Sequence, residues 1–102
     1  MMLGGYIVYT KALRGVRHYD IESKISLVLK YYVIEKIMGS GESYYGVEVE
    51  EKKVSGEMQY GTAYDRLLLS ESKEWVEELI NKLIGFGVTP VTLDCVIDEL
   101  VG

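Results

Sequence analysis

The chain has 102 residues, of which 48% are hydrophobic and 26% are charged, and its formal net charge is −5. These values predict one small folded domain spanning residues 1–102 and exclude a globally disordered chain. The single cysteine excludes an internal disulfide, and every apolar run is shorter than the ~20 residues that a membrane-spanning helix needs. The first residues lack the charged start of a secretion signal, so we expect a cytoplasmic protein without membrane contact.

Charge is distributed unevenly along the chain. Residues 1–24 carry four basic and two acidic side chains, whereas the remainder has an excess of seven acidic groups. A basic leading segment on an acidic body can contact that body, a partner chain or a polyanion. Nucleic-acid binding usually needs a basic face with net positive charge, so we do not expect it, and contact through residues 11–24 is our weakest hypothesis.

The leading segment, residues 1–26, is predicted in two parts. Tyr6–Thr10 has the pattern of a short strand, and Lys11–Ser26 has that of a loop or a brief helix. All nine tyrosines precede Asp65, whereas helical spacing of apolar residues occurs only after it. Aromatic side chains favour strands, so the order predicts a sheet first and helices last.

Residues 27–69 are predicted as an antiparallel meander of three strands, to which Tyr6–Thr10 would add a fourth. The strands are expected at residues 27–37, 44–54 and 58–69, with turns at Gly39–Glu42 and Ser55–Gly56.

The preferred register of the first two of these strands places apolar residues together on one face. It pairs Tyr32 with Val49 and Ile34 with Val47, and it pairs Lys30 with Glu51. Tyr31 and Val33 then lie opposite Glu50 and Glu48 on the other face. A slip of one residue would instead pair Lys30 with Lys52 and Ile34 with Glu48.

Residues 70–101 are predicted to form two helices that pack on one face of the sheet. The first begins near Ser70 or Ser72, whose hydroxyl can cap it, and ends at Gly85 or Gly87. Its apolar stripe comprises Val76, Leu79, Ile80, Leu83 and Ile84, with Trp75 at its edge. After Pro90, Thr92 is the predicted N-cap of the second helix. The stripe of that helix comprises Leu93, Val96, Ile97, Leu100 and Val101.

Two short helices bury such stripes only by packing on the sheet. We expect Leu79, Leu83, Val96 and Leu100 to be nearly fully buried. The predicted fold class is therefore α+β, an antiparallel meander of three or four strands followed by two C-terminal helices.

The sequence resembles a small uncharacterised family of clostridial-type bacteria, a domain of unknown function. The resemblance covers roughly residues 29–101 and includes Leu29-Lys30-Tyr31-Tyr32 and Tyr45-Gly46-Val47-Glu48-Val49. Its most specific part is Val88-Thr89-Pro90-Val91-Thr92-Leu93 before the last helix. The family has no known activity, so the resemblance implies no functional residue.

No motif predicts catalysis, a metal or a cofactor. His18 lies near two carboxylates, but a metal site needs three or four converging ligands, and this is the only histidine. Cys95 is expected to be a partly buried structural thiol, because its charged neighbour, Asp94, would not activate it. The stretch Gly39–Ser43 lacks the lysine of a phosphate loop and is predicted to be a hairpin loop. The acidic residues of both helices are expected to lie on solvated faces.

The tyrosines of the predicted strands are the main functional candidate. Helices can cover only one sheet face, so some rings must lie on the other, where tyrosine is enriched in protein interfaces. The possible interface residues are Tyr31, Tyr32, Tyr44, Tyr45, Tyr60 and Tyr64. An ordinary amphipathic sheet face is the competing interpretation.

We therefore predict a non-enzymatic module for protein interaction or self-association, with an unknown protein partner or a homodimer. The alternative is a small-ligand-binding protein or an enzyme with a pocket between helices and sheet.

Overall fold

The computed structural model describes residues 8–56 and 58–101, with the backbone alone at Val8 and Tyr60. Four antiparallel strands form one sheet in the order β1-β2-β3-β4. They are β1 (Val8–Glu22), β2 (Ile25–Ile37), β3 (Ser43–Ser55) and β4 (Met58–Ser70). The helix α1 (Lys73–Phe86), the 3₁₀ turn η1 (Pro90–Thr92) and the helix α2 (Leu93–Val101) follow. The predicted α+β meander is thus confirmed, with four strands.

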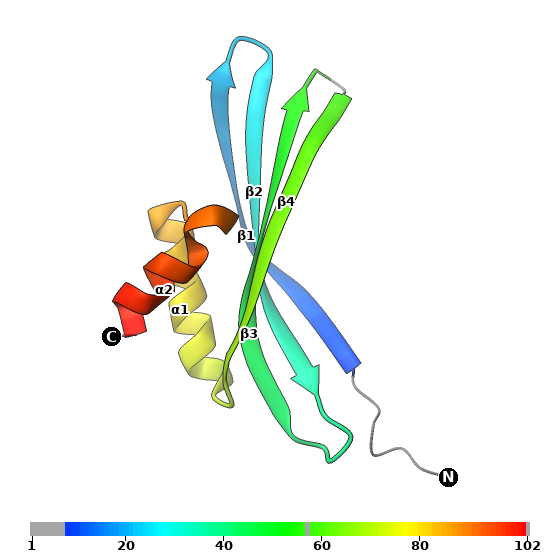
Figure 1. Cartoon of the computed structure of the whole chain (residues 1–102), viewed down its shortest axis with the longest axis vertical. Coiled ribbons are helices and arrows are strands. Elements are labelled where there is room, and N and C mark those ends of the chain that lie inside the picture. The colour runs from blue at the N-terminus through cyan, green and yellow to red at the C-terminus, as the bar shows by residue number, and fades with distance from the viewer. Residues whose placement is uncertain (1–7, 57, 102) are drawn as a thin grey trace.

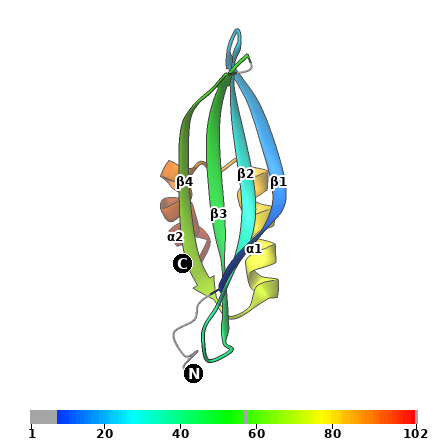
Figure 2. The same ribbon diagram turned by 90° about the vertical axis from the view of Figure 1, so that its right-hand side faces the viewer.

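Both helices lie on one side of a long, twisted sheet (Figures 1 and 2). In Figure 1 the helices stand beside the middle of the strands, and the two hairpin ends at the top extend beyond them. The molecule measures 55 × 35 × 18 Å, so it is thin across the sheet. One sheet face is therefore covered at its centre, and no helix of residues 8–56 and 58–101 lies on the other.

The prediction for Lys11–Ser26 was wrong, because β1 continues through this segment to Glu22. Of the short strand expected at Tyr6–Thr10, residues 8–10 lie in β1, and the rest lies outside the described residues. The pairing of β1 with β2 shifts between Leu13 and Gly15. An extra residue in a strand breaks the period-2 alternation, which hid the strand in the sequence.

The predicted register of β2 and β3 was also wrong, by one residue. Val49 pairs with Tyr31, and Val47 pairs with Val33. Tyr32 lies opposite Glu48, and Lys30 opposite Glu50. Because side chains alternate between faces, this shift moves every side chain of β2 to the face opposite the predicted one.

The core explains why this register is adopted. The odd-numbered positions of β2 are apolar from Leu27 to Val33, and they face the helices together with Val47 and Val49. The predicted register would have turned Leu29 and Tyr31, both fully buried, toward solvent. The free energy gained by burying this larger set of apolar side chains exceeds the free energy gained by pairing Ile34 and Tyr32 with valines.

The first helix begins and ends as predicted. The backbone N–H of Trp75 donates to Ser72 Oγ at 3.3 Å, which makes Ser72 the N-cap. Gly87 ends the helix in the left-handed conformation, with φ of 65°. Leu79 and Leu83 are buried, as expected. The hydroxyl of Tyr31 donates to the Val88 carbonyl at 2.8 Å, which ties the sheet to the segment after α1.

Three expectations for the second helix were wrong. Thr92 ends η1, and its hydroxyl donates back to the Thr89 carbonyl at 3.2 Å. Val96 and Leu100 are only half-buried, because the core side of α2 is centred on Leu93 and Ile97. Cys95, predicted to be partly buried, is exposed. It lies two positions from both core residues, on the far side of a helix with 3.6 residues per turn.

Candidate functional site on the open sheet face

The face of the sheet that turns away from the helices, here called the open face, faces the viewer in Figure 2. It carries the even-numbered side chains of the central strands, including Tyr32 and Ile34 from β2 and Glu48 from β3. At its centre the face is closed to water, because Ile34 and Glu48 each expose only 2% of their surface.

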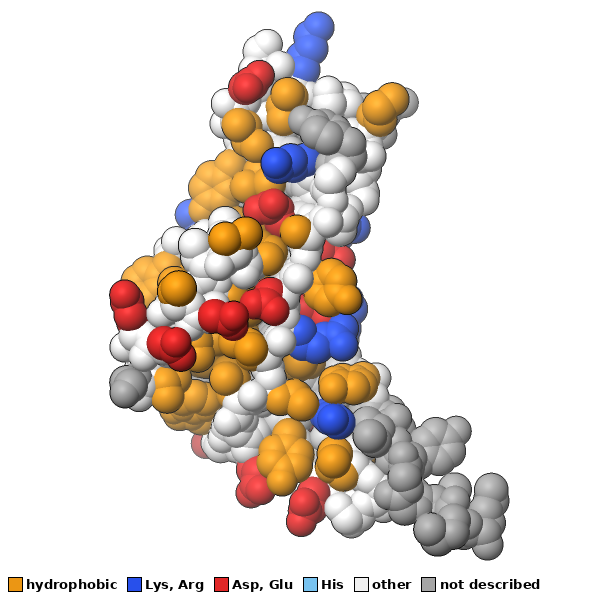
Figure 3. Space-filling model, in the orientation of Figure 1, with side chains coloured by type: hydrophobic (Ala, Val, Ile, Leu, Met, Phe, Trp, Pro, Cys, Tyr) orange, Lys and Arg blue, Asp and Glu red, His pale blue; other side chains and the backbone are white. Residues whose placement is uncertain are grey.

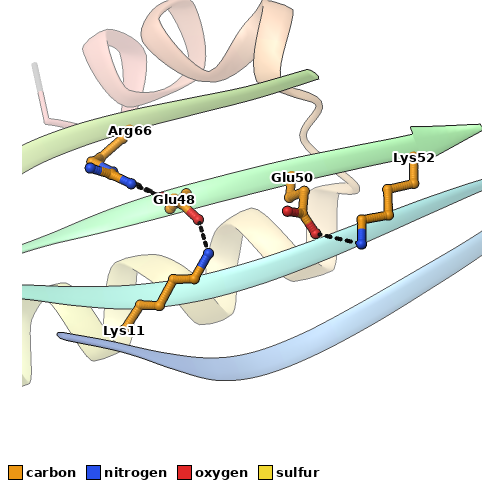
Figure 4. Close-up of polar contacts among 5 residues, drawn as sticks. All are labelled: Lys11, Glu48, Glu50, Lys52 and Arg66. Atoms are coloured by element: carbon orange, nitrogen blue, oxygen red, sulfur yellow. Dashed lines mark hydrogen bonds and ion pairs between the residues drawn. The ribbon is translucent and has the colours of Figure 1, made fainter. Parts of the chain in front are cut away.

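Glu48 is held by a cation from each edge strand (Figure 4). Lys11 Nζ on β1 donates to Glu48 Oε2 at 2.9 Å. Arg66 Nε on β4 donates to Glu48 Oε1 at 2.9 Å, and Arg66 Nη2 forms an ion pair with the same oxygen at 2.8 Å. A buried carboxylate needs such partners, and this one joins three of the four strands across the open face.

The two cations keep Glu48 ionised. Burial alone would raise the pKa of this carboxyl, but the hydrogen bonds from Lys11 and Arg66 outweigh burial and hold its pKa below the ordinary value. The same hydrogen bonds raise the pKa of Lys11 and of Arg66. All three groups are therefore charged at neutral pH.

Tyrosine rings surround this ionic network. Lys11 Nζ lies 4.4 Å from the centre of the Tyr32 ring. The centre of the Tyr9 ring lies 5.3 Å from the Arg66 guanidinium carbon and 5.6 Å from Lys36 Nζ. These are cation–π distances, so the rings help to fix the positions of the long basic side chains.

A hollow of about 240 Å³ lies beside the network. It is lined by Tyr9, Thr10, Lys11, Ile34 and Arg66. Figure 3 shows blue basic side chains gathered between orange hydrophobic ones to the right of the helices, next to β4. The hollow thus combines an apolar floor and an aromatic wall with two cations.

The backbones of β3 and β4 approach each other closely beside Glu48. A Cβ atom at Gly46 would overlap the Leu67 carbonyl oxygen, because the pairing of β3 and β4 shifts between Tyr45 and Gly46. A glycine is therefore required at this position, and it lies opposite Ile34.

Among the side chains that the structure describes, five large apolar or aromatic ones are exposed on the open face, all from the two edge strands. They are Tyr9, Leu13, Val16, Tyr64 and Leu68. Tyr64 is the most exposed of them, at 65%. Apolar side chains thus flank a charged centre on both sides.

The six predicted tyrosines do not form one surface. The register places Tyr32, Tyr44 and Tyr64 on the open face. Tyr31 is fully buried in the core and Tyr45 packs against the core on the helix side, so neither belongs to the open face. The side chain of Tyr60 lies outside the described part of the chain.

Four members of the site were not predicted from the sequence, namely Tyr9, Lys11, Glu48 and Arg66. One signal was present: a glutamate between two valines on a central strand, with basic residues on both edge strands of the sheet. Reading that signal required the register and the extent of β1, which were the two errors in the predicted sheet.

The basic leading segment contacts the body of its own chain. Arg14 forms a two-pronged ion pair with Glu77 of α1, with both N–O distances at 2.8 Å. Lys11 Nζ likewise donates to Glu48 of β3 at 2.9 Å. The charge pattern allowed this segment to contact its own body, a partner chain or a polyanion, and the structure shows the first of these contacts.

The remaining sequence candidates are dispersed. His18 is exposed on β1, and within residues 8–56 and 58–101 no group of three or more potential ligands is placed to hold a metal. Residues Gly39–Glu42 lie in the turn between β2 and β3, where Gly41 has φ of 92°, and Ser43 is the first residue of β3. Among the described residues, no helix is both long and apolar enough to cross a bilayer.

A second hollow, of about 400 Å³, lies beside α2 rather than between helices and sheet. Its lining is mostly apolar, from Phe86, Val88, Val96 and Leu100, with Thr92 and Glu99 as the polar members. The sequence-based alternative of a ligand pocket between helices and sheet stays a prediction.

Comparison with known proteins places the chain in a family. Searches of curated proteins and of solved structures gave no match. The family match begins inside β1, at residue 10, and so extends beyond the resemblance seen over residues 29–101. The chain belongs to the family whose model covers residues 10–102, described as Family of unknown function (DUF6514).

Proposed function

We propose that this protein is a non-enzymatic interaction module that binds a partner protein through the open face of its sheet. The observation that carries the proposal is the set of five exposed apolar and aromatic side chains on that face. Exposed aromatic side chains are enriched in contact surfaces between proteins, where apolar and polar groups alternate.

The charge of the open face defines the partner. We consider the part of the open face that spans Tyr9 to Val16 of β1 and the residues paired with that stretch on the other strands. It carries four basic side chains and two carboxylates. The basic residues are Lys11, Lys30, Lys36 and Arg66. A partner segment with acidic and apolar side chains would therefore complement the face.

The state of Glu48 supports a binding role over catalysis. Its two oxygens accept hydrogen bonds from fixed cations, and its pKa is held below the ordinary value. A general acid or base works best with a pKa near the operating pH and a free approach to substrate. Glu48 has neither property and acts as an anchor for the two cations.

The test compares two surfaces of matched apolar exposure. The open-face variant carries Leu13→Glu and Tyr64→Glu, and the helix-layer control carries Phe86→Glu and Val91→Glu, whose parent side chains are also exposed. Proteins retained from a host lysate by the wild-type chain are identified, and the recombinant partner is then titrated by calorimetry.

We expect the open-face variant to lose at least about tenfold in affinity, because it places carboxylates against an acidic partner. The control should bind as the wild type does, and added salt should weaken both. Equal binding by the open-face variant, or loss only in the control, would reject the proposal. Sedimentation at micromolar concentration shows whether a second copy of this chain is the partner.

A further inference from the structure

We propose that the hollow beside Glu48 is a binding site for one carboxylate group, supplied by an acidic side chain or chain end of the partner. The inference rests on the proposed function, since the hollow lies within the open face. It adds a specific chemical group and a specific place for it.

The two cations retain donors beyond those that Glu48 uses. Arg66 donates a hydrogen bond to Glu48 through Nε and forms an ion pair with it through Nη2, whereas a guanidinium has five N–H groups. Lys11 donates one of its three ammonium hydrogens to Glu48. Both side chains line the hollow, and their exposed fractions of 46% and 41% show that solvent reaches them. A ligand in the hollow can therefore accept hydrogen bonds from both.

The charge of the site matches a single anion. Lys11 and Arg66 together carry two positive charges and Glu48 carries one negative charge, which leaves an excess of one. Lys36 Nζ lies 5.6 Å from the centre of the Tyr9 ring and adds to the positive potential. A monoanion is attracted, and it neutralises the network without displacing Glu48.

The shape of the site favours a carboxylate on an apolar stem. Ile34 and the Tyr9 ring provide apolar walls, and about 240 Å³ accommodates a side chain of glutamate size or a small aromatic acid. The planar guanidinium of Arg66 presents paired donors that fit the two oxygens of a carboxylate.

Glu48 is then an internal competitor for the same donors. Replacing it with glutamine removes the negative charge but keeps the size, which frees Lys11 and Arg66 for an external anion. The structure therefore predicts tighter carboxylate binding in Glu48→Gln, an effect that a purely structural network would not produce.

The experiment titrates the full-length, isotope-labelled protein with sodium benzoate at constant ionic strength, and it follows the Arg66 Nε–H and Ile34 methyl signals by NMR. Benzamide is the uncharged control, and inorganic phosphate is the competing anion. The variants are Arg66→Gln, Lys11→Gln and Glu48→Gln, and the matched control is Lys52→Gln. Lys52 pairs with Glu50 at 3.6 Å on the same face but outside the hollow (Figure 4).

We expect saturable shifts with benzoate and none with benzamide. Affinity should fall about fivefold in Arg66→Gln and Lys11→Gln, and rise about fivefold in Glu48→Gln, since each change alters one charged hydrogen bond. Lys52→Gln should bind as the wild type does. If Arg66→Gln does not fold, Arg66→Lys keeps the charge and loses the paired donors, so it should bind more weakly.

Linear shifts, or equal affinities in all variants, would overturn the inference, and tighter binding of phosphate would overturn its assignment to a carboxylate. Failure here leaves the proposed function intact if Leu13→Glu with Tyr64→Glu still abolishes partner binding. If benzoate binds but Arg66→Gln leaves partner affinity unchanged, the site serves free carboxylates, and the assignment to the partner fails.

Discussion

The two faces of this sheet exclude water from their centres by different means. On the helix side, side chains such as Leu29, Val47 and Leu83 pack into a continuous apolar core. On the open side, a carboxylate is buried beneath two basic side chains whose aliphatic stems cross the strands. Long cationic side chains can shield a sheet while their charged ends stay near water.

The two faces have different roles, because one mainly stabilises the fold and the other presents groups for recognition. Apolar burial on the helix side supplies most of the free energy of folding, because it scales with the area removed from water. The ionic centre of the open face contributes less to stability, since its cations remain almost half exposed. It instead fixes charged and aromatic groups on a surface that a partner can reach.

The largest expected effect is on the helix side. Leu83→Ala removes a fully buried side chain and should lower the free energy of unfolding by about 2–5 kcal/mol. Leu13→Ala on the open face, where the side chain is 50% exposed, should cost less than about 1 kcal/mol. Chemical denaturation of both variants measures the contrast. Similar costs would mean that the open face carries core packing of its own.

The next effect tests the close approach of β3 and β4. Gly46→Ala places a Cβ against the Leu67 carbonyl and should cost about 1–3 kcal/mol, because the two strands must move apart. Gly85→Ala in α1 is the matched control. Apart from its chain neighbours and the backbone of α1 itself, no heavy atom lies within 4 Å of the added Cβ. Alanine also favours a helix, so thermal unfolding should show stabilisation of up to about 1 kcal/mol.

A hydrogen bond that links the core face to the helices gives a pH-dependent effect. Burial raises the pKa of Tyr31 to about 12, whereas an unfolded tyrosine titrates near 10. Between these values the native state binds more protons than the unfolded state, so its stability falls as pH rises from about 10 to about 12. Below pH 10 this contribution is fully present.

The variant Tyr31→Phe isolates that contribution from the other groups that titrate in alkali. It should cost about 1–2 kcal/mol at neutral pH, because the Val88 carbonyl loses its donor. Its stability should then fall less than that of the wild type between pH 10 and 12. Parallel curves from urea titrations at a series of pH values would place the phenol in contact with water.

Most of the fold follows from local signals in the sequence. The limits of β2, β3 and β4, the Ser72 cap and the Gly87 terminus all depend on residues close to one another along the chain. The apolar stripe of α1 predicted its buried face correctly. Local pattern is sufficient for these features because each is stabilised within one or two turns or strands.

The site was not predictable in the same way. Both columns of side chains in β2 contain apolar residues, so alternation alone did not distinguish the column with Tyr31 from the column with Ile34. A shift of one residue then exchanged the two faces and moved Glu48 away from its true neighbours. The extra residue near Leu13 concealed β1, which supplies Lys11. A site that joins three strands depends on every register between them.

The smallest expected effect concerns Glu48 itself, and it distinguishes the two faces most directly. Glu48→Gln keeps the shape of the side chain but removes its charge, and the two cations can recover hydration because solvent already reaches them. The cost should therefore be only about 1 kcal/mol at neutral pH. Glu50→Gln, which disturbs a longer pair with Lys52, is the matched control and should cost less.

The pH dependence of the free energy of unfolding in acid tests the same interaction. Because the folded-state pKa of Glu48 is lowered, its contribution is present above about pH 4.5 and is lost as pH falls through the folded value. Stability of Glu48→Gln should thus depend less on pH below about 4.5 than that of the wild type. Unchanged acid dependence, measured by urea unfolding from pH 3 to 7, would show that the carboxylate does not hold the open face together. A loss of several kcal/mol at neutral pH would instead mean that the ionic centre stabilises the sheet as strongly as the apolar core does.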